Sequence, residues 1–313
     1  MADHNKTLSE WESIFYNIYK QVDENREPEQ IWIGVTAHCS EIGEAIRKIH
    51  FPDLYKSAAH TICWFCSFIK KCNNTKFNIF KLNAKLSDVV LLKYPLKCGR
   101  CTHIPCDCPS KEMELMKDKS AKYSILYEEY KKVKNVDMTI TQWIDNFEKI
   151  YGGRINLLTL EIIGFHFLEE IGECAIAIRE LSQLKNVISQ NINGINDDFF
   201  NKLTDIGSIV NSYAKIKELL DTLDKDKKQK FTSKKPDIIK ARIVKAKMDM
   251  IVEIADAFSW FCDIFIKTSE IFDNCNCPKG ITLENEIENE YFKNGEYVCP
   301  ICEKTLCECV FFI

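Results

Sequence analysis

Apolar residues recur at three- and four-residue spacing along most of the chain, which is the spacing of an amphipathic α-helix. The clearest runs cover residues 11–22, 157–184 and 238–272. Few segments alternate with a period of two, and only eleven glycines and eight prolines interrupt the 313 residues. The pattern therefore predicts an all-α protein made of two helical bundles.

The same landmarks occur twice in the same order, which indicates an internal duplication. Each copy begins with W-x3-F-x2-I-Y, continues with an E-I-G-E segment and a W-F-C segment, and ends with C-x2-C-x4-C-x-C. The paired landmarks are Trp11 and Trp143, Glu41 and Glu170, Trp64 and Trp260, and Cys98 and Cys299. We expect a first copy at 1–110, a charged helix or linker at 111–136, and a second copy at 137–313 that carries a long insertion at about 182–237.

The second copy places carboxylates inside apolar helical segments. Glu170 and Glu173 lie three residues apart in the run 167–178, which is apolar on nearly every side and is therefore expected to be buried. Glu253 and Asp256 are also three apart, so each pair shares one helix face. Burying like charges is costly unless a cation lies between them, and oxygen ligands favour Mg²⁺ or Mn²⁺. The alternative is that these are surface carboxylates on ordinary amphipathic helices.

The two pairs resemble the E-x-x-E and E-x-x-D hallmarks of the all-α nucleotide pyrophosphohydrolases, the MazG and dCTP/dUTP pyrophosphatase superfamily. The segment R-I-N-L-L, which follows W-x3-F, is similar to one that precedes the acidic helix in several members. The resemblance covers most of the second copy apart from its insertion and cysteine tail. It implies that metal ions held by the four carboxylates activate a water, which attacks the α–β anhydride of a nucleoside triphosphate. The products would be a nucleoside monophosphate and pyrophosphate.

The resemblance also suggests roles for individual residues. Glu169 is expected to be an additional metal ligand or the base that orients the water. The expected catalytic residues are Glu169, Glu170, Glu173, Glu253 and Asp256, of which the last four hold the magnesium. The residues expected to contact the substrate are Trp143, Arg154, Asn156 and Trp260. For Trp143 the alternative is a place in the helix core, and for Arg154 it is a surface position at the start of a helix.

The first copy keeps one acidic pair and lacks the other. Glu41 and Glu44 match the first pair, but Ser57 stands opposite Glu253 and His60 opposite Asp256. We therefore expect the first copy to be catalytically dead or badly impaired. Because superfamily members usually assemble as dimers or larger oligomers, the chain is expected to form a homo-oligomer or to pair its two copies internally.

The two cysteine clusters predict metal sites. Sixteen cysteines behind a polar N-terminus without a signal sequence favour metal binding over disulfides. Four thiolates are the usual ligand set of structural Zn²⁺, so about two zinc ions are expected per chain. The expected ligands are Cys98, Cys101, Cys106 and Cys108 in one cluster and Cys299, Cys302, Cys307 and Cys309 in the other. The alternatives are free thiols, ligands paired across the copies, and an iron–sulfur cluster.

Charge and hydropathy reduce the number of possible partners and functions. The net charge of −4 offers no basic field for nucleic acid, although the run 225–235 is locally basic. No apolar stretch reaches the ~18–20 residues of a membrane span, so we expect a cytoplasmic protein without a membrane partner. The leading prediction is a Mg²⁺-dependent nucleoside triphosphate pyrophosphohydrolase. The alternatives are a non-catalytic nucleotide sensor and a zinc-stapled helical scaffold for protein interactions.

Overall fold

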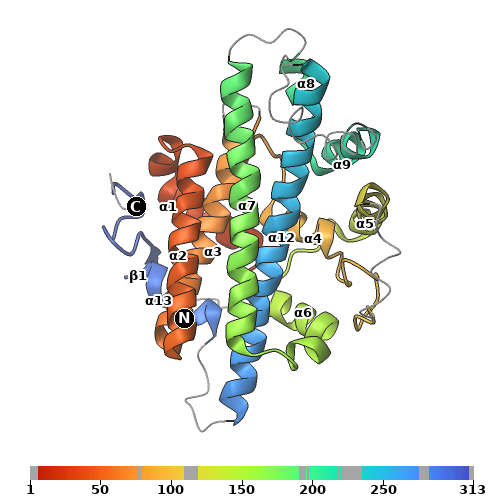
Figure 1. The fold of residues 1–313 in the computed structure, drawn as a ribbon. Helices are drawn as coiled ribbons and strands as arrows, with labels where there is room; N and C mark the ends of the chain where they lie inside the picture. Colours follow the sequence, from red (N-terminus) through yellow and green to blue (C-terminus); the bar gives the residue numbers. More distant parts are fainter. Residues whose placement is uncertain are drawn as a thin grey trace.

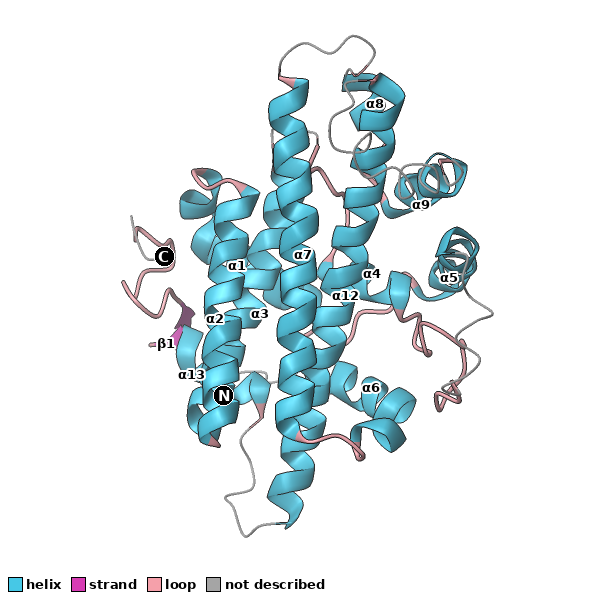
Figure 2. Cartoon of the chain, in the orientation of Figure 1, coloured by secondary structure: helices cyan, strands magenta, loops and turns pink. Residues whose placement is uncertain are grey.

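The computed structural model describes residues 6–75, 79–108, 119–189, 195, 197–216, 219, 235–274 and 282–309. These residues are predominantly helical, which confirms the all-α prediction (Figure 2). The helices are α1 (Leu8–Glu24), α2 (Pro28–Lys48), α3 (Phe51–Asn74), α4 (Leu86–Lys93), α5 (Lys119–Val133), α6 (Ile140–Ile155), α7 (Leu160–Ile188), α8 (Asp197–Asn201), α9 (Ile206–Lys215), α12 (Pro236–Asn274) and α13 (Leu283–Tyr291). The strands β1 (Phe292–Lys293) and β2 (Glu296–Tyr297) form an antiparallel hairpin.

Two helix pairs form the centre of the molecule, α2 with α3 and α7 with α12 (Figure 1). The pairs meet where α2 packs against α7, and two glycines bring these helices close together. A methyl group on Gly164 would lie 2.7 Å from the side chain of Ile46, and one on Gly43 would lie 3.1 Å from Leu168. Larger residues at these glycines would therefore push the two pairs apart.

Helices α1 and α6 start side by side. Each begins at a threonine N-cap, Thr7 or Thr139, that closes a capping box with the residue three positions on. The two threonines also form an antiparallel β-bridge with each other. One turn further on, Trp11 and Trp143 are completely buried, so each helix is fixed by its cap and by an aromatic anchor.

The segment that follows each helix pair packs on the other pair. Helix α4 follows α3 but packs on α12, whereas α13 follows α12 but packs on α3. The cysteine loops continue this crossing. The Cys106 N–H donates to the Ile150 carbonyl in α6 at 2.8 Å, and the Cys307 N–H donates to the Ile18 carbonyl in α1 at 2.7 Å. Each half of the chain therefore completes the surface of the other half.

Helix α9 packs on α12, and α5 packs on α4 and α9. The predicted linker is thus helical over Lys119–Val133, and the predicted insertion contributes α8 and α9. Lys247, buried in α12, donates to the backbone carbonyls of Lys81 and Leu203 at 2.8 and 2.7 Å. This contact ties the insertion to the central helices.

One face of α7 is exposed, so the prediction that the run 167–178 forms a buried helix is wrong for that face. Helices α2 and α12 cover two sides of α7 and leave an outward stripe of apolar side chains. This stripe consists of Ile162, Phe165, Leu168 and Ile176, and Phe165 is 73% exposed. Within the described ranges, no helix has the length and apolar content to cross a membrane.

Candidate active site

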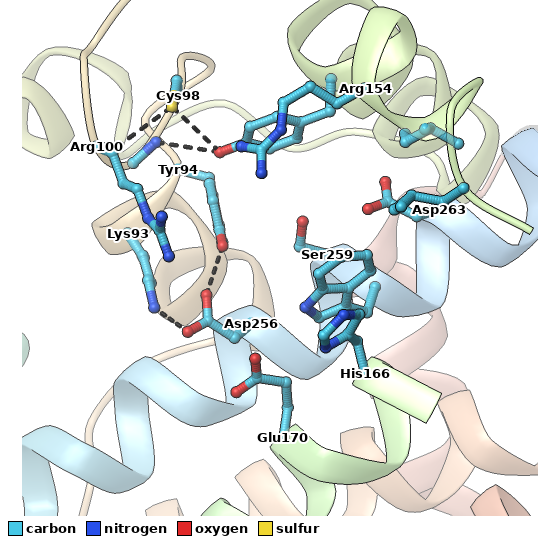
Figure 3. A pocket seen from close by; sticks show the side chains of 15 residues that line it. Lys93, Tyr94, Cys98, Arg100, Arg154, His166, Glu170, Asp256, Ser259 and Asp263 are labelled. Carbon is cyan, nitrogen blue, oxygen red and sulfur yellow. Dashed lines mark hydrogen bonds and ion pairs between the residues drawn. The ribbon is translucent and has the colours of Figure 1, made fainter. Parts of the chain in front are cut away.

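A cavity of about 350 Å³ lies between the central helices and the crossing segment of the first half (Figure 3). Helices α7 and α12 form its floor, and α6 and the loop after α4 form its walls. We call it the acidic cavity and define it by Lys93, Arg100, Arg154, Glu170, Asp256 and Asp263. Because its lining comes from both halves, neither half forms it alone.

Three carboxylates meet where the floor of the acidic cavity borders a neighbouring groove: Glu170 and Asp256 line the cavity, and Glu253 lines the groove. Glu170 comes from α7, and Glu253 and Asp256 come from one face of α12. One oxygen from each residue lies within 4.8 Å of the other two, and all three residues are half-buried. Burial raises the pKa of Glu253 to about 8; Asp256 and Glu170 add to this shift, while Lys93 opposes it. Burial, together with Asp256, also raises the pKa of Glu170.

Burial is the larger cause of both pKa shifts and the neighbouring carboxylates add to it, so the nearby cations do not offset the cost of ionising Glu170 and Glu253. The all-oxygen donor set and short mutual distances of the three carboxylates fit a hard divalent cation such as Mg²⁺ or Mn²⁺.

The crossing segment brings cationic and phenolic groups to this cluster. Lys93, at the end of α4, forms an ion pair with Asp256, and the adjacent Tyr94 hydroxyl donates to the same carboxylate. Lys122 of α5 lies nearby; burial, followed by repulsion from Lys93, lowers its pKa to about 8. The charge of Asp256 is thus partly neutralised by the Lys93 ammonium group.

The first cysteine loop forms the opposite wall. The Tyr151 hydroxyl donates to Cys98 Sγ at 3.5 Å, which joins this loop to α6. Arg100, between the first two cysteines of the loop, extends its guanidinium into the cavity, and Arg154 does the same from the end of α6 (Figure 3). The acidic floor therefore faces cationic walls.

The cavity also has an apolar lining. Ile155 and Leu158 contribute hydrocarbon to it, and the rings of His166 and Trp260 stack with centroids 4.7 Å apart. Asp263 lies among these groups and is only 4% exposed.

Several predicted site residues are brought together here. Glu170, Glu253 and Asp256 form the carboxylate cluster, and Arg154 and Trp260 line the same cavity. Four of the residues expected to bind metal or substrate therefore line one cavity, and Glu253 lies against its carboxylates from the neighbouring groove.

The other predicted residues lie elsewhere. Glu173 is exposed and lines a neighbouring groove, and Glu169 is exposed and pairs with His166 at 3.1 Å. Trp143 is fully buried in the core, where it packs on Phe258 and does not line the cavity. Asn156 is the exposed C-cap of α6 and does not line the cavity either.

Sequence reasoning missed Lys93, Tyr94 and Arg100, because all three belong to the first half, which lacks the second acidic pair. The one available signal was the arginine between the first two cysteines of the cluster, C-G-R-C, where the second cluster has C-P-I-C.

The first half has a matching cavity of about 430 Å³, which we call the histidine cavity. We define it by Arg26, His38, His60, Trp64, Glu290 and Tyr291. The two imidazole rings stack with centroids 5.1 Å apart. His60 contacts the Tyr291 hydroxyl at 2.9 Å and Glu290 at 3.5 Å. Burial, followed by repulsion from His38, lowers the pKa of His60 to about 4.

The acidic pair of the first half makes no cluster with further carboxylates among the described residues. Glu41 instead pairs with His38 at 2.8 Å and accepts a hydrogen bond from Ser57 at 3.3 Å, while the exposed Glu44 pairs with Lys48 at 2.5 Å.

Each cysteine cluster gathers four thiols in the same knuckle. All four sulfur atoms of a cluster lie within 4.8 Å of one another, and none of the eight cysteines forms a disulfide. The sulfurs of Cys98 and Cys108 are 3.7 Å apart and those of Cys299 and Cys309 are 3.9 Å apart. Tetrahedral Zn–S bonds of about 2.3 Å place sulfurs about 3.8 Å apart, so both clusters fit zinc.

The knuckle backbones also match. The Thr102 N–H donates to the Cys98 carbonyl at 2.9 Å, and the Glu303 N–H donates to the Cys299 carbonyl at 2.8 Å. Thr102 and Glu303 both have left-handed backbone conformations, with φ of 60° and 56°. The spacing of the cysteines thus sets one local structure in two places.

Comparison with known proteins gives no match: no family model, curated protein or solved structure matches the chain. The assignment of function therefore depends on the residues of the acidic cavity.

Proposed function

We propose that this chain is a Mg²⁺- or Mn²⁺-dependent nucleoside triphosphate pyrophosphohydrolase that acts in the acidic cavity. One observation carries the proposal: half-buried carboxylates from α7 and α12 converge on the floor of a cavity whose walls hold Lys93, Arg100 and Arg154. Clustered carboxylates suit a divalent cation, and the facing cations suit the oxygens of a polyphosphate. The cavity therefore offers ligands for both the metal ion and the phosphates of a metal–nucleotide complex.

Glu170, Glu253 and Asp256 would hold the cation. When bound, it would polarise the phosphate and lower the pKa of a water molecule. Hydrolysis adds that water to the α-phosphorus, breaks the bond to the α–β bridging oxygen, and gives a nucleoside monophosphate and pyrophosphate. One carboxylate of the cluster accepts the proton of the water.

The cationic side chains orient the phosphates and stabilise the leaving group. Lys93 already contacts Asp256, so a small rotation carries its amine to a phosphate oxygen. Arg100 and Arg154 reach in from two different walls and neutralise charge on the departing pyrophosphate. Holding these groups in place before the substrate arrives lowers the cost of ordering them during the reaction.

We further propose that the chain is a tandem duplication of a MazG-like unit, folded as an internal pseudo-dimer with exchanged C-terminal segments. The support is the repetition of contacts: α4 on α12 and α13 on α3, and Cys106 to Ile150 and Cys307 to Ile18. In this arrangement the first half supplies Lys93 and Arg100 to the cavity of the second.

The two cysteine clusters are proposed to hold one structural zinc ion each. Four thiolates fill a tetrahedral shell, so zinc there leaves no open position for substrate. Its role would be to fix the loop that carries Arg100 and the matching loop of the histidine cavity.

Incubation with Mg²⁺ and a panel of ribo- and deoxynucleoside triphosphates, followed by assay of pyrophosphate and monophosphate, tests the enzyme. We expect turnover, and we expect Glu170→Gln to lower kcat about 100- to 1000-fold because it removes one oxygen ligand's charge. Glu41→Gln is the matched control in the histidine cavity and should leave the rate near that of the unchanged protein.

Equal losses from Glu170→Gln and Glu41→Gln would contradict a single active cavity. Metal-dependent nucleotide binding without product would indicate a nucleotide sensor, and neither binding nor product would leave a zinc-stapled scaffold.

A further inference from the structure

Asp263 is a buried carboxyl group of the acidic cavity that the proposed reaction leaves without a role. It lies seven residues after Asp256 on the same face of α12 and is 4% exposed. Its Oδ1 has no hydrogen-bond partner among the described residues, and none of them forms an ion pair with it. Figure 3 shows its carboxyl group turned toward the cavity.

The surroundings of Asp263 do not satisfy this carboxyl group. Ile155 and Leu158 line the same end of the cavity with hydrocarbon. Burial raises the pKa of Asp263 well above its usual range, and the charge of Arg154 opposes that shift. A buried polar group without a partner is costly, so its retention needs a polar partner that enters the cavity.

The matching end of the histidine cavity shows the contrast. There Ser67 stands at the position of Asp263, three residues after the paired tryptophan, and Asp23 stands at the position of Ile155. Asp23 is satisfied within the protein, because Arg26 pairs with it at 3.3 Å and Ser67 hydrogen-bonds to it. The acidic cavity thus gives Asp263 no counterpart of the Arg26 and Ser67 side chains that satisfy Asp23 in the histidine cavity.

We infer that Asp263 recognises the base of the bound nucleotide and favours bases with an exocyclic amino group, namely cytosine, adenine and guanine. The inference rests on the proposed function, which assigns the phosphates to the Glu170, Glu253 and Asp256 end. Seven residues of helix separate Asp263 from that end by ~10 Å, which leaves room for the sugar between phosphate and base. Ile155, Leu158 and Trp260 provide apolar walls for a planar ring.

The preference for an amino group follows from hydrogen-bond chemistry. An amino N–H can donate to Asp263 whether the carboxyl group is neutral or ionised. A base that presents a carbonyl oxygen at the same place can bind only the protonated group and meets lone pairs when the group is ionised, so the base with the amino group, which suits both forms, is favoured.

Binding measurements on the full chain test this inference. The probes are α,β-methylene analogues of CTP and UTP, and of ATP and ITP, with Mg²⁺, and also free cytidine and uridine without metal. We expect the amino-bearing member of each pair to bind about tenfold more tightly. In Asp263→Asn the ratio should fall toward one, because an amide can rotate to present either a donor or an acceptor.

Two further measurements separate recognition from a structural role. Asp263→Asn should not lower the melting temperature, because it removes an unpartnered buried carboxyl group. Asp249→Asn is the matched control on the same helix; Asp249 pairs with Lys245 at 2.5 Å outside the acidic cavity, so the base preference should persist.

The outcomes are distinguishable from those of the proposed enzyme. A ratio near one in the unchanged protein, or a ratio unaffected by Asp263→Asn, overturns the inference even if turnover is found. Base-selective binding of cytidine without any pyrophosphate release supports the inference and overturns the enzyme. Failure of every nucleoside and nucleotide to bind overturns both.

Discussion

The two cavities of this molecule occupy matching places in the fold and differ in how their polar groups are paired. In the histidine cavity Glu41 is paired with His38, His60 with Tyr291, and Asp23 with Arg26. In the acidic cavity three carboxylates crowd together, and a fourth, Asp263, lacks a hydrogen-bond partner for its Oδ1 among the described residues.

The charges at matching positions are also reversed. The tyrosine at the end of each crossing helix is kept, but the residue before it is Lys93 in one half and Glu290 in the other. Lys93 meets Asp256, and Glu290 meets His60. Arg100 of the first cysteine loop has Ile301 as its counterpart.

This difference supports the proposal that the acidic cavity is the functional one of the two. The two cavities use matching helices and knuckles, but the histidine cavity pairs Asp23 and Glu41 within the protein, whereas the acidic cavity leaves Asp263 Oδ1 without a hydrogen-bond partner among the described residues. Unrelieved electrostatic cost tends to mark functional sites, because folding alone gives no reason to keep it.

The largest effect is expected when the acidic cavity receives a residue of the histidine cavity. Asp256→His replaces an oxygen ligand by an imidazole, which is a poor ligand for Mg²⁺, so turnover should fall about 100- to 1000-fold. Steady-state rates at several Mg²⁺ concentrations measure this. His60→Gln is the control in the other cavity, and similar losses from both substitutions would remove the distinction between the cavities.

The cysteine loops provide a smaller and more selective effect. Cys101→Ser and Cys302→Ser should each lower the zinc content from about two ions per chain to about one. Only Cys101→Ser should reduce turnover, by about 10- to 100-fold, because its loop positions Arg100 in the acidic cavity. Metal analysis and kinetics on the same samples test both statements.

A direct comparison of the loop residues sharpens that test. Arg100→Ala should raise KM for the triphosphate, whereas Ile301→Ala should leave it unchanged. An equal effect of the two cysteine substitutions would show that zinc stabilises the whole fold and does not act through Arg100.

The smallest effect is a pair of opposite pH slopes in the stability of the metal-free protein. Glu253 has a pKa of about 8 in the folded state against 4.5 normally, so the folded state holds the extra proton and stability falls as pH rises between these values. His60 has a pKa of about 4 against 6.5 normally, so the unfolded state holds the extra proton and stability falls as pH drops from 6.5 to about 4.

Melting temperatures in chelator test these slopes. Glu253→Gln should flatten the slope on the alkaline side and His60→Gln the slope on the acid side, each by about 3–6 °C. If either substitution changes the slope assigned to the other, the two cavities are not independent.

Local features of the sequence predicted much of this molecule. Helical spacing identified the all-α class. The three-residue spacing of Glu253 and Asp256 placed two carboxylates on one helix face. The repeated cysteine spacing identified both knuckles. These features are local, because a helix or a four-cysteine loop determines its own geometry within a few residues.

Features that depend on packing were not predictable. Lys93 and Arg100 enter the acidic cavity because the crossing segment packs on the opposite half, and periodicity contains no information about that crossing. Trp143 has the spacing of either a core or a stacking residue, and it lies in the core. Ile176 lies in the run 167–178 that was expected to be buried, but it is 57% exposed because no described element covers its face of α7.

The crossing of α4 and α13 has a consequence for synthesis on the ribosome. When the first half emerges, its cysteine loop has no docking site, because α6 is translated later. The surfaces of α1 and α3 that the second cysteine loop and α13 cover likewise remain exposed until those segments have been translated. The newly synthesised first half therefore exposes a surface that only segments translated later can cover.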